Sequence, residues 1–579
     1  MHGARPLGGR AVGRLRHDGA TRQGARHGRA RVTGGTPLTL GALLDAAAER
    51  YPEKAAFVFR GARVTYRELL GRVDRLARGF LALGLGPGDH VVVWMPNCVE
   101  WAVANLALAK VGAVTVTCNS RYKALEVEYL LEQSDAKALI MVDRFEAAGV
   151  EYLPILREVC PDVMWRADRR LHAAKFPELR HVIVLGASRD PGCLDWADLE
   201  ARGGAVPAGE LARIRVGPDD PAEMLYTSGT TGSPKGCLLS HGNFWYKCRV
   251  YLDAHAWTPD DRCLVPVPYF HIFGAMGGIA ANVLAGSTQV LMDVFEPEEA
   301  MRLVQAERAT IFSGVPTMFI AILGHPKFGA YDLGSLRTGT IGAAPVPIET
   351  MRRILDARHG LGMDATVVYG LTEATGGTHF TLRGDPIEKR VTTVGKPTPE
   401  LADRIVDPAT GLPVGPGVEG EVCVKGPTLM LGYYKRPEAT AEKVRDGWLH
   451  TGDMGVKDAD GYLTITGRLT DMIIVGGFNT YPAEIENFYL RNPKILDVSV
   501  VGVPDPLLGE VVMAFVIPKA GESLTPEEVI EFARGRIANF KVPRHAEIVR
   551  EFPLTGSGKV QKFKQKAAAI ETYGFKGPV

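Results

Sequence analysis

The segment "YTSGTTGSPKG", at Tyr226–Gly236, decides how the rest of the chain is interpreted. Its eleven positions hold three glycines, five serines and threonines, one proline and one lysine, a composition that neither a core strand nor a helix favours. Backbone N–H groups of a glycine-rich turn can converge on an anion, while hydroxyls add donors and lysine adds positive charge. Phosphate is therefore the ligand that we expect, although a plain surface turn can share this composition.

This loop differs from the Walker A phosphate loop, in which a glycine immediately precedes the lysine. Pro234 holds that position here, and proline has no N–H group and a fixed φ angle. The sequence therefore predicts a phosphate loop of a different kind.

The surrounding chain has the bulk properties of a multidomain globular protein. Its 579 residues predict about two to four domains, and a net charge of +1 argues against a nucleic-acid binder. The longest apolar run, Trp101–Cys118, is interrupted by Asn105 and Lys110, so we expect no transmembrane segment. The eight cysteines form no Cys-x-x-Cys pair and have no zinc spacing, which favours buried thiols in a reducing cytoplasm.

Residues 1–35 differ from the rest, since they carry eight arginines and one aspartate. They contain no apolar stretch of the kind found in a secretory signal. An organelle transit peptide is one interpretation of such an arginine-rich, acid-poor segment. We favour a disordered tail, or a start codon assigned too far upstream.

Short apolar strands alternate with helical patterns from about Leu38 onward. Residues 40–51 have helical periodicity, and "HVVVW", "ALIMV" and "HVIVL" are typical of buried strands. This alternation predicts parallel sheets covered by helices. After about Arg404, short strands follow one another across Gly, Pro and Asp turns, which indicates antiparallel pairing.

We therefore predict an α/β protein in three parts. Residues 1–35 are the extension, and residues 36–468 form a large domain of helix-covered β-sheets with a small β-barrel-like subdomain. Residues 469–579, about 110 in number, form a small, mobile α+β domain at the C-terminus.

Six motifs occur along the chain in a fixed order. After the phosphate loop come "GAAP" at Gly342–Pro345, "YGLTEA" at Tyr369–Ala374, "HTGD" at His450–Asp453, "GRLTDMIIVGGFNTYPAEIE" at Gly467–Glu486 and "PLTGSGKVQK" at Pro553–Lys562. Over roughly residues 38–570, the chain resembles the adenylate-forming superfamily of acyl-CoA synthetases, nonribosomal adenylation domains and luciferases. Within this superfamily, its sequence most resembles acid–CoA ligases of the fatty-acid and aryl-acid type.

The resemblance implies a two-step reaction. A carboxylate attacks the α-phosphate of ATP to give acyl-AMP and pyrophosphate, and the thiol of CoA then displaces AMP. Catalysis of this kind depends mainly on positioning and on neutralising negative charge. The resemblance thus implies ATP, Mg²⁺ and CoA as cofactors, and leaves the acid open among medium-chain or long-chain fatty acids, aryl acids and alicyclic acids.

The resemblance assigns the phosphates to the opening loop, through Thr227, Ser228, Gly229, Thr230, Thr231, Gly232 and Lys235. Glu373 would hold Mg²⁺ together with Thr230, and Thr372 would donate a hydrogen bond to the α-phosphate. One carboxylate combined with phosphate oxygens and water suits Mg²⁺. The alternative for Glu373 is a charge at a helix N-terminus.

The resemblance also implies an adenosine site. Gly342, Ala343, Ala344 and Pro345 would form the adenine platform, and Tyr369, next to Gly370, would stack on the other face. Asp453 would accept hydrogen bonds from the ribose hydroxyls, and Arg468 would contact ribose or phosphate. A strand-to-turn exit would equally explain residues 342–345, and a domain-boundary salt bridge would explain Arg468. His450 and Thr451 have the character of structural residues.

Lys559 receives the catalytic role, because its ammonium would bridge the carboxylate and the α-phosphate. Without its "PLTGSGK" context it would be an ordinary surface lysine. The small domain would rotate between the two steps at a hinge, where Thr470 replaces the usual Asp or Lys of the family. Gly476, Gly477 and Phe478 would then line a tunnel for pantetheine, although a plain hairpin turn also explains the two glycines.

His271, in "PYFHIFG", resembles the residue that closes the acyl pocket, and a core histidine is the alternative. Residues 274–278, 313–319 and 338–344 would line the pocket, and their small side chains predict a fairly open, apolar cavity. No Arg or Lys is evidently placed to bind a second carboxylate.

An ATP-dependent acid–CoA ligase of the cytoplasm is the principal prediction, with a homodimer left open. An acyl-AMP ligase that loads a separate carrier protein is the main alternative, and a luciferase-like oxygenase shares the first step. A non-catalytic ATP-binding scaffold is a further alternative, which the combination of Lys559, Glu373 and Asp453 disfavours.

Overall fold

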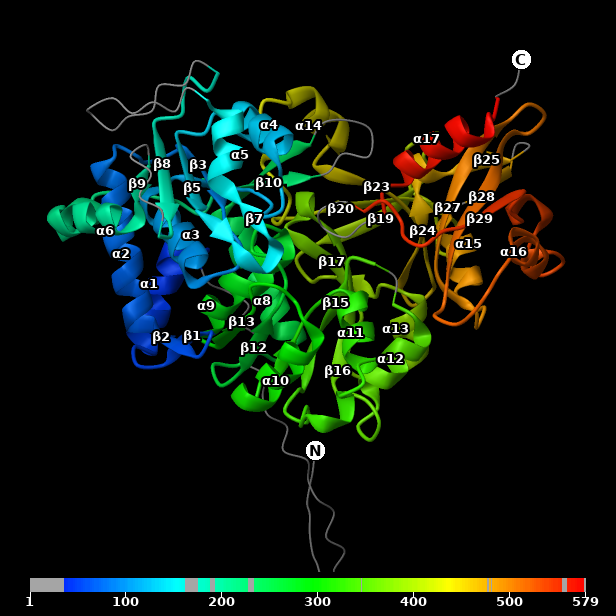
Figure 1. The fold of residues 1–579 in the computed structure, drawn as a ribbon, viewed down its shortest axis with the longest axis horizontal. Helices are drawn as coiled ribbons and strands as arrows, with labels where there is room; N and C mark the ends of the chain where they lie inside the picture. The colour runs from blue at the N-terminus through cyan, green and yellow to red at the C-terminus, as the bar shows by residue number, and fades with distance from the viewer. Residues whose placement is uncertain are drawn as a thin grey trace, which may run out of the picture. The chain divides into compact units, whose positions relative to one another are not determined.

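Parallel strands flanked by helices form most of the computed structural model (Figure 1). The structure describes residues 36–161, 175–187, 193–227, 234–344, 346–475, 478–480, 482–554 and 560–576. Contacts group residues 37–579 as one unit.

The first sheet carries the hairpin that flanks the phosphate loop. Its strands run in the order β21 (Gly432–Tyr433), β11 (Lys235–Ser240), β10 (Pro221–Thr227), β4 (Val114–Thr117), β3 (His90–Trp94), β5 (Ala138–Val142), β8 (His181–Leu185) and β9 (Leu194–Asp195). Strands from β10 to β9 are parallel, whereas β11 and β21 are added antiparallel at one edge. This parallel centre is the arrangement that the alternating pattern predicts.

The second sheet is also parallel at its centre. Its order is β18 (Lys396–Pro397), β17 (Gly376–Phe380), β16 (Asp364–Leu371), β15 (Thr338–Gly342), β14 (Ile311–Phe312), β12 (Arg262–Val265), β13 (Thr288–Leu291), β1 (Ala55–Phe59) and β2 (Ala62–Thr65). Strands β15 and β16 pair in parallel, so their carboxyl ends lie at the same edge of the sheet. Open α/β sheets bind their ligands at such edges.

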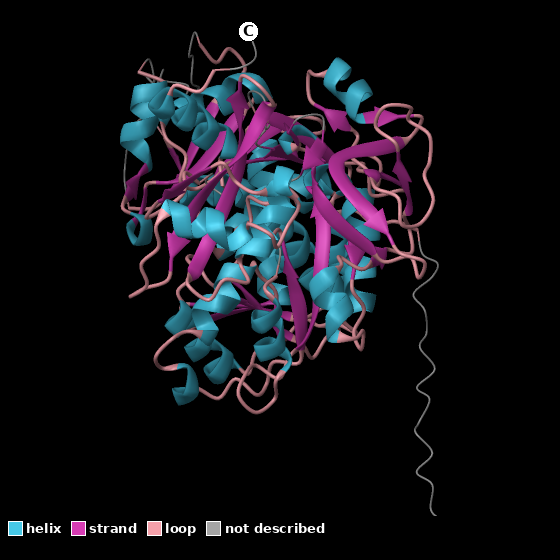
Figure 2. Cartoon of the chain, turned by 90° about the vertical axis from the view of Figure 1, so that its right-hand side faces the viewer, coloured by secondary structure: helices cyan, strands magenta, loops and turns pink. Residues whose placement is uncertain are grey.

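Helices lie against these sheets, as Figure 2 shows from a second direction. They are α1 (Leu40–Arg50), α2 (Tyr66–Ala82), α3 (Val99–Val111), α4 (Ala124–Ser134), α5 (Tyr152–Val159), α6 (Trp196–Ala205), α7 (Ala208–Leu211), α8 (His241–Ala254), α9 (Ala281–Ala285), α10 (Pro297–Glu307), α11 (Pro316–Leu323), α12 (Ile348–Leu355) and α13 (Ile387–Thr392). A π-helix, Phe273–Ala280, runs directly into α9.

The long apolar run of the sequence is explained by α3, which is buried on nearly every side. Lys110, near its end, pairs with Asp45 and Asp74 at N–O distances of 2.5 and 2.6 Å. Among the described residues, we find no helix with the length and apolar character needed to cross a membrane.

Mainly antiparallel pairing takes over after about residue 400. One sheet contains β19 (Ala402–Val406), β20 (Gly420–Lys425), β23 (Trp448–Lys457), β22 (Val444–Arg445) and β24 (Leu463–Arg468), next to α14 (Pro437–Lys443). The other contains β26 (Phe478–Thr480), β25 (Ile473–Val475), β28 (Gly509–Pro518), β27 (Ile495–Asp505) and β29 (His545–Ile548), with β28 and β29 as a parallel pair. Helices α15 (Pro482–Tyr489), α16 (Pro526–Ala533) and α17 (Lys562–Tyr573) accompany the second of these sheets, and a two-stranded ribbon, β6 (Arg144–Phe145) and β7 (Val150–Glu151), lies earlier in the chain. The predicted α/β fold class is thereby confirmed.

Candidate active site

The phosphate loop is the connection between β10 and β11, two antiparallel strands in which Thr227 lies opposite Lys235. The Thr227 hydroxyl donates to the Lys235 carbonyl across this pair, at 3.4 Å. The structure thus brings the two ends of the predicted loop together. Ser228, Gly229, Thr230, Thr231 and Gly232 lie outside the described residues.

Glu373, the predicted metal ligand, lies in a short 3₁₀ helix, Thr372–Ala374, at the carboxyl end of β16. Its side chain is buried, and its Oε1 accepts a 2.6 Å hydrogen bond from the Tyr433 hydroxyl. Burial, together with the Glu373 charge, raises the pKa of Tyr433, so this phenol stays protonated and donates. No hydrogen bond to Glu373 Oε2 is found among the described residues, which leaves that oxygen suited to a cation.

Lys235 approaches the same tyrosine. Its Nζ lies 5.3 Å from the centre of the Tyr433 ring, within the range of a cation–π contact. Sequence reasoning missed Tyr433, because only the pairing of β21 with β11 brings it to the loop. Its place in the "GYY" stretch gives no signal of this role.

The turn after β15 has the backbone that a close ligand approach requires. A Cβ at Gly342 would lie 2.3 Å from Val368 Cγ1, so glycine is needed at this position. Ala343 has a φ of 71°, a left-handed conformation that is costly for a residue with a side chain. Ala343 and Ala344 are exposed at the sheet edge, as an adenine platform requires, and Pro345 lies outside the described residues.

Asp453 is buried in β23 and accepts two side-chain hydrogen bonds. The Tyr369 hydroxyl donates to Oδ2 at 2.5 Å, and Arg468 Nε donates to Oδ1 at 3.0 Å. Tyr369, which precedes Gly370 in β16, and Arg468, at the end of β24, therefore meet at one carboxylate. Arg468 forms a salt bridge within one sheet, not across a domain boundary, and each Asp453 oxygen retains a further lone pair for a hydroxyl donor.

The residues before Asp453 are held by Glu421 on β20. Its Oε2 accepts from His450 Nδ1 at 2.7 Å, and its Oε1 accepts from the Gly452 N–H at 3.0 Å. Thr451 donates to the Val422 carbonyl at 2.7 Å. These contacts fit the structural role expected for His450 and Thr451, and they fix the backbone that presents Asp453.

Cys423 completes a cluster that the sequence spacing did not reveal. Its sulfur and the side chains of Glu421 and His450 place three potential metal-ligand atoms within 4.8 Å of one another. The hydrogen bonds just described already satisfy both oxygens of Glu421. Burial raises the pKa of the Cys423 thiol to about 12, so the thiol is neutral. The hydrogen bonds that join His450 to Cys423 and Glu421 account for the closeness of the three side chains.

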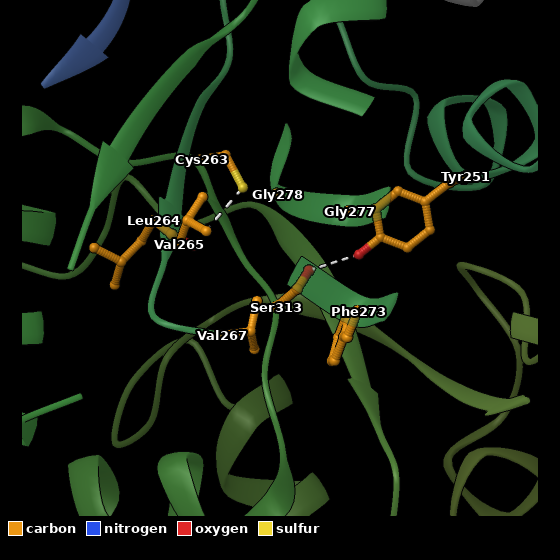
Figure 3. A pocket seen from close by; sticks show the side chains of 9 residues that line it. All are labelled: Tyr251, Cys263, Leu264, Val265, Val267, Phe273, Gly277, Gly278 and Ser313. Carbon is orange, nitrogen blue, oxygen red and sulfur yellow. Dashed lines mark hydrogen bonds between the residues drawn. The ribbon is translucent and has the colours of Figure 1, made fainter. Parts of the chain in front are cut away.

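A small apolar pocket lies next to the π-helix (Figure 3). Its cavity volume is about 10 Å³, room for about one water molecule. It is lined by Tyr251, Cys263, Leu264, Val265, Val267, Phe273, Gly277, Gly278 and Ser313. Gly277, Gly278 and Ser313 come from stretches predicted to line an acyl pocket. The pocket is narrower than expected, because Tyr251 and the two valines, which sequence reasoning did not select, occupy its walls.

His271 lies directly before this π-helix and organises its start. Its carbonyl accepts the N–H groups of Gly274 and Ala275, both at 2.9 Å, and its Nδ1 accepts the Phe273 N–H at 3.3 Å. The imidazole is half-buried. His271 therefore precedes by two residues Phe273, which lines the pocket, and it is not buried as a core histidine would be.

Several predicted residues lie outside the described part of the chain. They are Gly476, Gly477 and Lys559, together with the side chains of Thr470 and Phe478. Their roles remain predictions. The residues that the structure does bring together offer a cation, a buried carboxylate for a metal, and acceptors for a diol.

Two family profiles match the chain. The profile of the AMP-binding enzyme family matches residues 44–434, and that of the AMP-binding enzyme C-terminal domain matches residues 484–559. Among known relatives, the putative acyl-CoA synthetase YngI of Bacillus subtilis (strain 168) is 41% identical, over 92% of this chain and 98% of its own. The mitochondrial medium-chain acyl-CoA ligase ACSF2 of Bos taurus is 37% identical, over 91% and 86% of the two chains.

Two solved structures are similar to this chain over nearly its whole length. ATP-bound MatB from Rhodopseudomonas palustris superposes with a TM-score of 0.78 at 29% identity, covering 93% of this chain and 100% of its own. The o-succinylbenzoate CoA synthetase MenE from Bacillus subtilis, in complex with its acyl-adenylate intermediate, superposes with a TM-score of 0.75 at 26% identity. That match covers 90% of this chain and 97% of MenE.

Proposed function

The chain belongs to the AMP-binding enzyme family and is an AMP-forming acid–CoA ligase, and on that premise we propose that its acid is a medium-chain fatty acid. The observation that carries this proposal is the lining of the cavity beside the π-helix, which holds no charged side chain. The cavity would widen around the acyl chain on binding. An uncharged, apolar wall favours a hydrocarbon tail over a second carboxylate. Similarity to a relative named as a medium-chain ligase supports the same choice.

We place the triphosphate of ATP at the loop between Thr227 and Lys235. The Lys235 ammonium would neutralise phosphate charge, and Glu373 would hold Mg²⁺, with Thr230 as its second ligand. When bound, Mg²⁺ supplies further positive charge to the phosphate oxygens. The oxygen of Glu373 that is not used by Tyr433 supports this assignment. Thr372, next to it, would donate to the α-phosphate.

The adenosine is placed along the carboxyl ends of β15 and β16. Ala343 and Ala344 would face one side of the adenine, and the Tyr369 ring would face the other. Asp453 would accept hydrogen bonds from the ribose hydroxyls. Arg468 would keep the Asp453 carboxylate in position through its own hydrogen bond to Oδ1. The hydrogen bonds that orient Asp453 support this assignment.

Lys559 would close the site in the first step, carried by a small domain over residues 469–579. Rotation of that domain near Thr470 would then bring Gly476, Gly477 and Phe478 to the CoA thiol. Support comes from the resemblance of "PLTGSGK" and from the C-terminal family profile, whose match reaches residue 559. The boundary itself, after residue 468, is part of the proposal.

We further propose a cytoplasmic enzyme of fatty-acid metabolism. All eight cysteines are free thiols and seven of them are buried, which suits a reducing compartment. Import of the tagged full chain into a membrane-bound organelle would contradict this location. Light scattering of the purified chain tests the homodimer that the sequence leaves open.

Release of pyrophosphate, measured across a panel of carboxylic acids with and without CoA, tests the function. We expect release with ATP and a medium-chain acid, and formation of acyl-CoA and AMP when CoA is added. A best rate with an aryl or alicyclic acid would overturn the substrate assignment. Acyl-AMP that forms but does not react with CoA would indicate a ligase that loads a carrier protein. ATP binding without release of pyrophosphate would indicate a non-catalytic scaffold.

A further inference from the structure

Tyr433 contacts both of the charged groups that the proposed reaction gathers around the triphosphate. Its hydroxyl donates to Glu373 at 2.6 Å, and its ring faces the Lys235 ammonium at 5.3 Å. We propose that Tyr433 is a positioning residue, which orients Glu373 toward the metal ion and holds Lys235 ready for the phosphates. This inference rests on the proposed function, because it takes Glu373 as the metal ligand.

The backbone around Tyr433 is tied to the strand that begins at Lys235. Strand β21 pairs with β11, with Tyr433 opposite Cys237. The Leu431 N–H donates to the Leu238 carbonyl at 2.9 Å, and the Tyr434 N–H donates to the Gly236 carbonyl at 2.8 Å. The backbone of Tyr433 is therefore fixed relative to β11, which begins at Lys235, by main-chain hydrogen bonds on both sides of it.

The same segment is tied to Glu373. The Met430 N–H donates to the Glu373 carbonyl at 2.8 Å, and the Thr375 hydroxyl donates to the Thr428 carbonyl at 2.7 Å. Backbone and side chain of Glu373 thus contact one short stretch, residues 430–433, and Thr375 holds the same segment at Thr428. Because Met430 holds the backbone of Glu373, the hydrogen bond from the Tyr433 hydroxyl determines the orientation of the Glu373 carboxylate.

A hydrogen bond to an ionised carboxylate is short and strong, so it restricts the side chain to one rotamer. Occupation of Oε1 leaves Oε2 as the oxygen that a metal ion would meet. Loss of a hydrogen-bond partner behind a metal ligand typically weakens metal binding by about 10- to 100-fold. The ring separately attracts the ammonium of Lys235, and this attraction does not depend on the hydroxyl.

The two contacts can therefore be separated by substitution. Tyr433→Phe removes the hydroxyl and keeps the ring, whereas Tyr433→Leu removes both. The matched control is Tyr434→Phe, because the neighbouring hydroxyl donates to Asp135 at 2.8 Å and contacts neither Glu373 nor Lys235. Glu373→Gln serves as the reference for loss of the metal ligand.

Binding of Mn²⁺ to the full chain with a non-hydrolysable ATP analogue, followed by electron paramagnetic resonance, is the readout and needs no turnover. We expect Tyr433→Phe to raise the dissociation constant of Mn²⁺ about tenfold, with metal-free binding of the analogue unchanged. Tyr433→Leu should also weaken binding of the analogue without metal. Tyr434→Phe should match the wild type in both measurements.

The outcomes distinguish this inference from the proposed function. If Glu373→Gln weakens Mn²⁺ binding but Tyr433→Phe does not, the positioning role is wrong while the metal site stands. If Glu373→Gln leaves Mn²⁺ binding unchanged, the assignment of the metal ligand fails as well. Equal weakening by Tyr434→Phe would mean that any change in this segment disturbs the site, which would overturn the specific role of Tyr433.

Discussion

Tyr369 and Asp453 lie 84 residues apart in the sequence, yet the phenol donates a 2.5 Å hydrogen bond to the carboxylate. Burial, with the Asp453 charge beside it, holds the pKa of Tyr369 well above its usual range, so the phenol remains a donor. Arg468 contributes the compensating charge from the adjacent strand, at 3.0 Å. Three strands, β16, β23 and β24, therefore converge on one acceptor, whose orientation is set by two protein donors.

Tyr369→Phe should weaken ATP binding, because it leaves one Asp453 oxygen without its donor. A hydrogen bond to a charged group contributes about 1.5–3 kcal/mol, so we expect the KM for ATP to rise about tenfold or more. The control is Tyr462→Phe, which removes a comparable hydroxyl that donates to Asp385 at 2.9 Å. Equal KM values in the two variants would show that Asp453 does not depend on Tyr369.

The sequence predicted the strands and helices around this site far better than it predicted the contacts between their side chains. The alternation of strands and helices predicted the parallel sheets, and the order of motifs proposed Glu373, Asp453 and Arg468 as site residues. Glu373 follows β16 and Arg468 ends β24, whereas Asp453 lies inside β23. Periodicity therefore indicated the strands, and the motifs indicated the residues on them. Their mutual distances depend on which strands become neighbours, and periodicity carries no information on that pairing.

Tyr433 and Tyr251 are two residues whose contacts the sequence did not predict. Tyr433 reaches Glu373 only because the two-residue strand β21 pairs with β11, some two hundred residues earlier in the chain. Tyr251 enters the pocket from α8 because its hydroxyl bonds Ser313, at 2.9 Å (Figure 3). Both are large aromatic residues in apolar stretches, and the sequence alone predicts that such residues belong to the hydrophobic core.

Lys559→Ala and Gly477→Leu should separate the two half-reactions. Lys559→Ala should abolish formation of acyl-AMP, since no other group would bridge the carboxylate and the α-phosphate, while thioester formation from supplied acyl-AMP continues. Gly477→Leu should slow the second step first, because it narrows the proposed pantetheine path. Pyrophosphate release and acyl-CoA formation, assayed separately, distinguish them.

Lys564→Ala, in an exposed position of α17, is the control for Lys559. It should leave both half-reactions at wild-type rates. Equal loss of both half-reactions in Lys559→Ala would contradict its role in adenylation. A larger loss of adenylation than of thioester formation in Gly477→Leu would show that the tunnel is misplaced.

Gly277→Ala should shift the substrate preference toward shorter acids. A Cβ at Gly277 would lie 3.6 Å from Phe273 and 3.8 Å from Tyr251, so the added methyl group fits without displacing either ring. Both rings line the pocket, and the methyl group therefore occupies its space. We expect the ratio of kcat/KM between a longer and a shorter acid to fall about tenfold, the effect of roughly one methylene in an apolar site.

Gly329→Ala is the matched control, because a Cβ there would meet no atom within 4 Å. It should leave the chain-length profile unchanged. A Gly277→Ala profile that is lowered evenly for all acids would place the acyl chain elsewhere.

Glu223 should make the stability of the fold depend on pH. It is buried in β10, where Asn105 donates to Oε1 at 2.9 Å, and Oε2 has no partner among the described residues. Burial raises the pKa of this carboxyl to about 8, from its usual value of 4.5. Between these values the folded chain keeps a proton that the unfolded chain has released. Stability should therefore be highest below pH 4.5 for this group, and fall by about 1.4 kcal/mol per pH unit up to about pH 8.

Glu223→Gln keeps the size and the acceptor for Asn105, and it removes the titrating proton. The variant and the wild type should have similar urea midpoints near pH 5, and the variant should become the more stable of the two as the pH rises to 8. Glu146→Gln, which changes a side chain that is 84% exposed, should show no such divergence. If the midpoint of Glu223→Gln instead runs parallel to that of the wild type from pH 5 to 8, the carboxyl is ionised in the fold.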